Sequence, residues 1–319
     1  MRFDLPKRAS RTIYSRIAAT MCGTFCKLPG VDAVAVSVFT DTPFSDTKGA
    51  PHDDFVRVLH RRLEQSGFEL RASLCQARDG WASYLDPFPL GGHKLSDVVM
   101  DDIPDDRRPL AGDQHSLGAV PSAEPEQIVR FMAELHRLHA LGHAIEDEGA
   151  EFPDDLLPLN DVPLFAEQVL EWDTSQLDEH GVLLVLAIQQ PSIRDLVMLQ
   201  WASRLEVGDA LFDYGVGRQL GGSLTEDDIE ELMFGRGPRP NRERVENGIA
   251  VLRQLLSVSA GEHRLPLLTM LAWLHWALGS GSAAGAFLAQ AVSINERYGM
   301  AEVLLTVFAH YPLPEWAFE

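Results

Sequence analysis

The stretch AVAVSVF, residues 33–39, decides the fold class of this 319-residue chain. Its residues are small, β-branched or aromatic, none of them is charged, and a turn-forming cluster follows them. An apolar run this short is typical of a strand that is buried on both faces of a sheet. We therefore expect residues 33–39 to form the central strand of an α/β domain.

The segments on either side of this strand have helical periodicity. Residues 12–28 repeat an apolar side chain every four positions, which predicts an amphipathic helix ahead of the strand. Residues 55–63 place apolar side chains on one face in the same way, and Asp53 or Asp54 is the expected N-cap of that second helix. The order helix, strand, helix is the beginning of a parallel crossover unit.

A second and a third strand follow. Residues 68–76 alternate in polarity as a strand does, and their connection to the first strand through a helix predicts a right-handed parallel crossover. The dipeptide Asp79-Gly80 is a signal for a two-residue turn, so residues 81–85 are expected to return as a hairpin strand. The predicted sheet is therefore small and mixed.

A proline- and glycine-rich segment, residues 87–125, separates this sheet from the rest of the chain. Its composition is that of loops, with one short strand expected at residues 98–100. After it the pattern is helical almost throughout. We expect an α/β domain over residues 1–120 and a helical region over residues 121–319.

The helical region shows periodic segments at residues 126–145, 164–172, 177–189, 193–202, 225–234, 243–258, 267–278, 283–294 and 301–309. Thr225 is the expected cap of one of them. Small residues at Ala272, Ala284 and Ala291 have the spacing of one tetratricopeptide-type helical hairpin within residues 240–312. Such units normally stack in series, and no second copy is evident, so a hairpin that packs on the remaining helices is expected.

Charge and cysteine content restrict the possible partners and location. The net charge is −20, from 47 acidic and 27 basic residues, and such a surface repels phosphate backbones and anionic bilayers. We therefore expect no nucleic acid and no membrane among the partners. Three cysteines form no disulfide framework, and the longest apolar run is too short to span a bilayer, so a cytoplasmic location is predicted.

Three histidines are the strongest candidates for a metal site. His136, His139 and His143 lie on one side of a predicted helix, and Glu146 follows one turn later. His139, however, falls on the apolar stripe of that helix, where a histidine that only packs is more common, and no side chain that orients the ligands is evident. Cys22 and Cys26, four residues apart, are expected to be buried apolar residues in the same way. We predict no metal site.

Other catalytic signatures are weak or missing. The glycines of residues 215–221 resemble a phosphate-binding loop, but their spacing is irregular and no strand precedes them. The chain has no Walker sequence, no nucleophile elbow and no zinc-protease motif. Arg194 and Asp195 are expected to form a local ion pair in the first turn of a helix. No catalytic residue and no cofactor are predicted.

Several short segments together resemble a known family, the actinobacterial "domain of unknown function 4192". They are MRFDLP (residues 1–6), the strand at residues 33–40, DGWASY (residues 79–84), IRD (residues 193–195), LPLLTMLAWL (residues 265–274) and the alanine-rich helix that follows Gly279. The resemblance covers nearly the whole chain and implies shared fold and lineage. It implies no activity, because the family has none assigned.

Two departures from the family pattern are visible. Members usually carry an apolar stretch ahead of the Asp-Leu-Pro segment, and this sequence begins just after it. Some members also have cysteines after the hairpin, where this chain has Asp86, Pro87 and Phe88, so a metal role for that loop is not expected. A sheet that lacks its first strands exposes an edge, which predicts either a homodimer or an edge covered by residues 87–121.

Two functions remain open on the sequence alone. The preferred one is a noncatalytic interaction or regulatory protein whose helical region offers a groove to a protein partner. The alternative is an enzyme or small-ligand binder with a pocket at the carboxyl ends of the strands, near residues 40–41 and 76–79. Asp41, Asp46 and Arg78 are the first candidates for that pocket.

Overall fold

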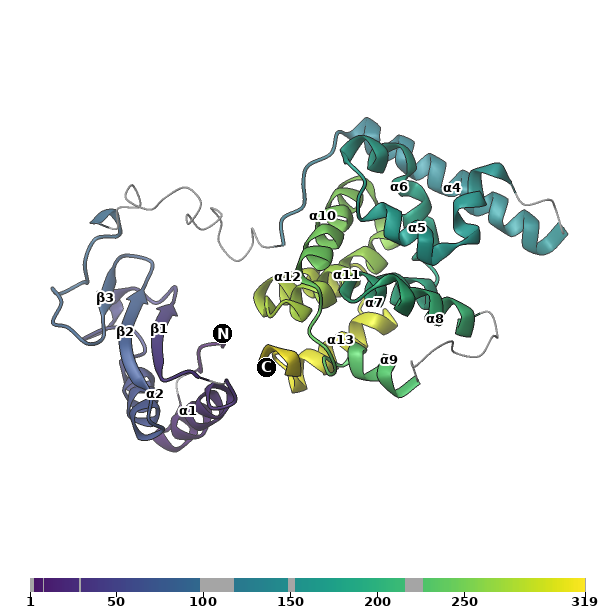
Figure 1. The fold of residues 1–319 in the computed structure, drawn as a ribbon. Coiled ribbons are helices and arrows are strands. Elements are labelled where there is room, and N and C mark those ends of the chain that lie inside the picture. The colour runs from purple at the N-terminus through teal and green to yellow at the C-terminus, as the bar shows by residue number, and fades with distance from the viewer. Residues whose placement is uncertain are drawn as a thin grey trace. The chain divides into compact units, whose positions relative to one another are not determined.

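The protein forms two compact units, one of residues 1–111 with 318–319 and one of residues 112–317. The computed structural model describes residues 3–7, 9–28, 30–97, 118–148, 153–215 and 226–318, with backbone alone at 144–148 and 226–228. The sheet lies in the first unit, and the described part of the second is helical (Figure 1). The predicted combination of a small mixed sheet with a helical C-terminal region is confirmed.

In the described part of the chain the sheet contains three strands, β1 (Ala33–Phe39), β2 (Glu69–Gln76) and β3 (Trp81–Ser83), in the spatial order β1-β2-β3. β1 and β2 are parallel, with Phe39 opposite Gln76 at their carboxyl ends. β3 runs antiparallel to β2 after the Asp79-Gly80 turn. The parallel crossover and the hairpin are therefore both present where the sequence predicts them.

Two helices, α1 (Arg11–Phe25) and α2 (Asp53–Gln65), pack against each other beside this sheet. Ser10 caps α1 by accepting a hydrogen bond from the Ile13 N–H. The expectation that Asp53 or Asp54 caps α2 is wrong. The cap position is His52, in the left-handed conformation with φ of 61°, and both aspartates lie in the first turn, where they stabilise the helix dipole.

The prediction for the first strand is also wrong. β1 lies at the edge of the sheet, and only one of its faces is buried. Val38 joins Val56, Leu63 and other apolar residues in the core on that face. On the opposite face Phe39 is 65% exposed. The error has a physical reason. Small and uncharged residues occur both in edge strands and in central strands, so the sequence pattern does not distinguish the two positions.

The first half of the helical unit contains α4 (Pro125–Glu148), α5 (Val162–Val169), α6 (Thr174–Ala187), α7 (Pro191–Ala202), α8 (Leu205–Gly215) and α9 (Glu226–Met233). All except α8 correspond to predicted segments. α8 follows α7 after only two residues, and the sequence pattern did not separate it. The expected strand at residues 98–100 and the expected cap Thr225 lie outside the described residues.

The second half contains α10 (Arg242–Val258), α11 (Arg264–Ala277), α12 (Gly281–Ile294) and α13 (Gly299–His310). α11 and α12 form the predicted hairpin, joined by three residues. Ala272, Ala284 and Ala291 are all fully buried there. Small side chains at these positions let the two helix backbones approach closely, which confirms the sequence interpretation.

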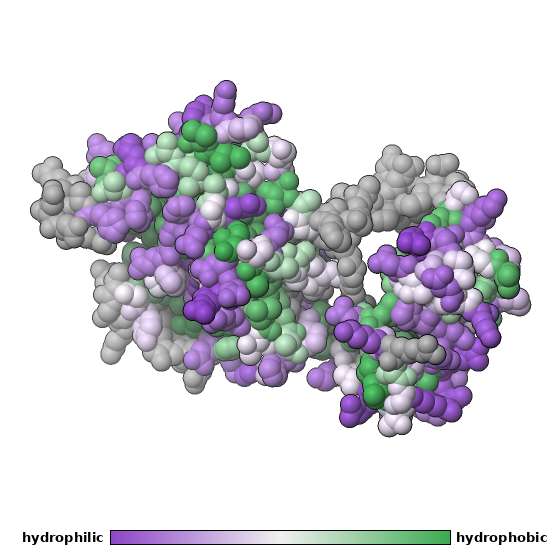
Figure 2. Space-filling view, turned by 180° about the vertical axis from the view of Figure 1, so that it is seen from behind, coloured by the Kyte–Doolittle hydropathy of each residue, from purple (hydrophilic) through white to green (hydrophobic). Residues whose placement is uncertain are grey.

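Buried tryptophans anchor the core of the helical unit. The indole N–H groups of Trp201 and Trp316 donate to the carbonyl oxygens of Ala166 and Ala277, each at 2.9 Å. Each of these rings therefore fills apolar space without leaving a polar atom unpaired. Outside this core, Figure 2 shows hydrophobic patches among hydrophilic residues on one face of the helical unit.

Candidate functional site

The carboxyl ends of β1 and β2 are filled by an aromatic side chain. Phe44, in the short 3-10 turn η1 (Phe44–Asp46), is buried and packs edge-on against Phe88 with ring centroids 5.8 Å apart. Gly92 lies so close to the Phe44 ring that an added Cβ would come within 3.1 Å of it. Open α/β sheets bind ligands at this end, and here Phe44 occupies that position.

The polar residues at these strand ends support the loop. The Asp79 carboxylate accepts hydrogen bonds from the backbone N–H groups of Phe44, at 2.8 Å, and of Ser45, at 3.3 Å. These bonds lower the pKa of Asp79. Asp41, Asp46 and Arg78 are exposed, and no ion pair joins any of them in the described part of the chain. The structure does not bring the three candidates together.

A serine and a histidine meet beneath α2. His60 Nε2 lies 2.7 Å from the Ser73 hydroxyl, a contact that sequence reasoning missed because the two residues belong to different elements. Burial lowers the pKa of His60, as expected for a neutral ring. Ser73, however, is 0% exposed, so no substrate reaches its hydroxyl. The pair satisfies buried polar atoms and does not form a nucleophilic site.

The candidate histidines meet a fourth one from a distant turn. The rings of His139 and His143 lie edge to face with centroids 4.5 Å apart, while His136 faces His263 at 5.7 Å. Burial lowers the pKa of His263, and the nearby His136 and His139 lower it further. In the ranges that the structure covers, no group of three His, Cys, Asp or Glu side chains is placed to hold a metal ion. The side chain of Glu146 lies outside them.

Arg194 and Asp195 form the local ion pair that the sequence predicts. Arg194 is buried, its Nε donates to Asp195 at 2.8 Å, and its Nη1 donates to the Tyr298 hydroxyl at 3.0 Å. Burial raises the pKa of Asp195, although Arg194 opposes that effect. Because the guanidinium bridges α7 to the segment before α13, the pair connects elements of the core.

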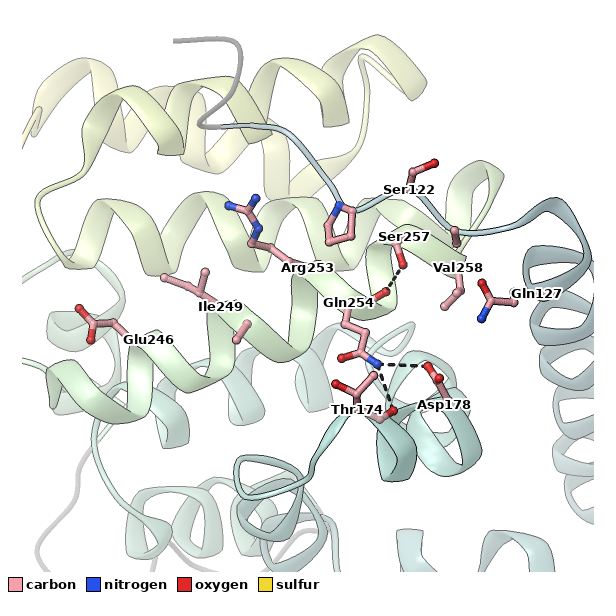
Figure 3. Close-up of a pocket in the computed structure, with 13 residues that line it drawn as sticks. Ser122, Gln127, Thr174, Asp178, Glu246, Ile249, Arg253, Gln254, Ser257 and Val258 are labelled. Atoms are coloured by element: carbon pink, nitrogen blue, oxygen red, sulfur yellow. Dashed lines mark hydrogen bonds between the residues drawn. The ribbon is translucent and has the colours of Figure 1, made fainter. Parts of the chain in front are cut away.

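A groove of about 550 Å³ follows one side of α10. It is lined by α10 residues between Glu246 and Val258, by residues of the segment 121–127, and by Thr174 and Asp178 at the start of α6 (Figure 3). The floor is mixed in character, because the apolar Ile249 alternates with charged and amide side chains. The volume falls within the usual range for ligand pockets.

One wall of this groove is an extended piece of the chain itself. Residues 118–124 are not helical and lead directly into α4. Arg253 Nη2 donates to the Ala119 carbonyl at 2.6 Å, and Gln290 Nε2 donates to the Gly118 carbonyl at 3.0 Å. Val120 packs against the helical core. The segment is therefore held through backbone carbonyl groups and one apolar anchor.

The opposite wall presents further amide and carboxylate groups. Gln254 Nε2 donates to the Thr174 carbonyl and to Asp178 Oδ1, both at 3.1 Å (Figure 3). The Ser257 hydroxyl donates to the Gln254 carbonyl at 2.6 Å. These lining groups donate and accept hydrogen bonds, but no histidine stands beside a hydroxyl among the described lining residues. The arrangement suits the binding of a polar main chain better than covalent catalysis.

Comparisons with known proteins give one match. A family model described as Domain of unknown function (DUF4192) matches residues 1–315. No curated protein and no solved structure matches the chain. Among the described helices, none is both long and apolar enough to cross a bilayer.

Proposed function

Because the chain belongs to the family described as Domain of unknown function (DUF4192), we propose a function from the geometry of its helical unit. The protein is a noncatalytic cytoplasmic interaction protein, and the groove beside α10 binds an extended segment of a protein partner. This proposal develops the groove that the sequence led us to expect in the helical region.

The observation that carries the proposal is the extended segment 118–124 in the wall of the groove. Arg253 and Gln290 bind the carbonyl oxygens of that segment, and carbonyl groups are present in every peptide. A partner peptide that displaces this segment meets the same donors for its own carbonyl oxygens. Gln127 and Ser122 add polar side chains along the open side.

The charge of the unit indicates which peptides fit. Residues 112–317 contain 31 acidic and 12 basic side chains, whereas residues 1–111 with 318–319 contain 16 acidic and 15 basic ones. Asp178 and Glu246 bring that acidic excess into the groove. We therefore propose a partner segment that is neutral or basic, and the same excess disfavours nucleic acid.

The test uses a peptide of known sequence. In a variant with residues 118–123 replaced by glycine and serine, a labelled peptide corresponding to residues 118–124 should bind in trans, as followed by fluorescence anisotropy. Adding Arg253→Ala to this variant should weaken the binding about tenfold, the usual effect of losing a charge-assisted hydrogen bond. Arg297→Ala, an exposed arginine away from the groove, is the control. Equal effects of the two alanine substitutions would refute the proposal.

A pocket at the strand ends, the alternative function, has less support. Phe44 fills that position, and Asp79 is engaged with backbone N–H groups. No observation in the described part of the chain brings Asp41, Asp46 and Arg78 to one site. The groove beside α10 has the volume and the convergent polar groups that the strand ends lack.

We also propose that the protein forms a homodimer through β1. No strand pairs with the outer edge of β1 among the described residues, and β1 carries no charged side chain. Natural edge strands usually carry charges or prolines that prevent pairing, and an edge without them favours it. A strand from a second copy fits such an edge.

A further inference from the structure

A second cleft, in the first unit, gathers positive charge. It has a volume of about 340 Å³ and lies between the start of α1 and the outer face of α2. Arg11 of α1 and Arg57 and Arg61 of α2 line it. Arg57 and Arg61 are one helical turn apart and therefore point to the same side of α2.

The guanidinium charges in this cleft are compensated only in part, by Asp53 on Arg57 and by Asp54 in the lining. Arg57 pairs with Asp53 at 2.5 Å, but neither Arg11 nor Arg61 has an ion-pair partner among the described residues. The first unit has nearly equal numbers of acidic and basic side chains, so two arginines without an ion-pair partner leave a local positive charge in the cleft. Guanidinium groups bind phosphate in a bidentate manner, and Arg11 and Arg61 are available to do so in this cleft.

Tyr14 and the N-terminus of α1 also border this cleft. Tyr14 lines the cleft, and its hydroxyl oxygen accepts a hydrogen bond from the Ala9 N–H at 3.2 Å. The proton of that hydroxyl has no acceptor in the described part of the chain. Ser10 caps the Ile13 N–H of α1, which leaves the N–H groups of Arg11 and Thr12 without partners within the helix, and no acidic residue occupies that first turn. Both features add to the attraction for an anion.

From these groups we infer that the cleft binds the phosphate group of a small phosphomonoester. Its volume falls within the range of small-molecule sites and leaves space beyond one phosphate. Asp54 and Val58 line the remaining part. The Asp54 carboxylate accepts hydrogen bonds from hydroxyl groups and repels a second anion, so the organic part is neutral and hydroxylated, as in a sugar phosphate.

Isothermal titration calorimetry on the full-length protein tests this site. Inorganic phosphate and glucose 6-phosphate should both bind with one saturable heat, the sugar phosphate more tightly, and glucose should give none. Arg11→Gln and Arg61→Gln should each weaken phosphate binding about tenfold. Both side chains are exposed, so the thermal unfolding midpoint should stay unchanged.

Arg16→Gln is the matched control, because Arg16 lies on the same helix, is exposed and does not line the cleft. It should leave phosphate binding unchanged. Two results would overturn the inference. One is the absence of saturable heat for both phosphate compounds at about 10 mM, well above the usual range for small-molecule sites. The other is an equal loss of affinity in all three glutamine variants, which would indicate attraction by net charge alone.

Discussion

His275 is a half-buried titratable residue of α11 in the helical unit. Its ring stacks on Phe287 with centroids 5.4 Å apart, and its Nε2 has no hydrogen-bond partner among the described residues. Burial, with a smaller contribution from Arg253, lowers its pKa from 6.5 to about 4. Between pH 4 and pH 6.5, His275 binds a proton in the unfolded chain but not in the folded protein. Its contribution to stability is therefore complete above pH 6.5 and is lost as the pH falls toward 4.

Replacing His275 by phenylalanine preserves the ring stack and removes the titrating group. We expect the difference in free energy of unfolding between variant and wild type to shift by about 2 kcal/mol in favour of the variant from pH 7 to pH 4. Urea denaturation at a series of pH values measures this shift. Parallel pH profiles for the two proteins would show that His275 does not titrate as described.

Two helical glycines allow a matched comparison. A Cβ at Gly248 of α10 would lie 2.6 Å from the ring of the buried Trp201, whereas a Cβ at Gly285 of α12 would meet nothing within 4 Å. Alanine in the interior of a helix stabilises it by about 1 kcal/mol relative to glycine. Gly285→Ala should therefore stabilise the protein.

Gly248→Ala should have the opposite effect, because overpacking a core typically costs about 1–3 kcal/mol. Urea unfolding curves of both variants provide the comparison. An increase in stability for Gly248→Ala would mean that Trp201 does not pack against α10 in this way.

At the scale of single elements, local patterns predicted much of the fold. The bounds of β1 were predicted as residues 33–39, and the helical hairpin at α11 and α12 was predicted from alanine spacing. These features depend on near neighbours in the sequence, so periodicity and turn residues are sufficient. α8 was missed because the connection from α7 is too short to interrupt the helical pattern.

The order of the strands could not be predicted in this way. Whether β1 is central or at the edge depends on which strands pair, and that is a long-range property. Ala35 and Ser37 are small enough to tolerate solvent, so their side chains give no signal for either position. The left-handed conformation of His52 ahead of α2 could not be predicted either. Its side chain hydrogen-bonds to Thr40, which follows β1 and lies 12 residues earlier in the sequence.

The proposed dimer is tested at this edge strand. Ser37 is exposed on β1, and lysine there places a charge on the pairing edge. Ser37→Lys should convert a dimer into a monomer, as measured by light scattering after size exclusion. Ser15→Lys, on the exposed side of α1, makes the same change in charge and should leave the dimer intact. A wild-type protein that is monomeric at high concentration would contradict the dimer.

At the scale of the whole molecule, the individual residues of the groove beside α10 could not be predicted from the sequence. Its walls come from residues near 120, 175 and 250. No local motif connects such distant segments, so the sequence indicated only that a helical region was present to offer a groove. In the sequence, Arg253 and Gln254 are indistinguishable from the other polar residues of an amphipathic helix. Their roles depend on the carbonyl groups that they bind in distant segments.

The most direct measurement compares the intact chain with the variant in which glycine and serine replace residues 118–123. The replacement keeps the backbone carbonyl groups but removes the apolar Val120 anchor, so the segment is held in the groove less tightly. If the groove binds extended peptides, the built-in segment competes with added peptide, because a tethered segment has an effective concentration on the order of millimolar. The labelled 118–124 peptide should then bind the variant at least roughly tenfold more tightly than the intact chain. Equal affinity for the two proteins would place the peptide elsewhere and contradict the proposed function of the helical unit.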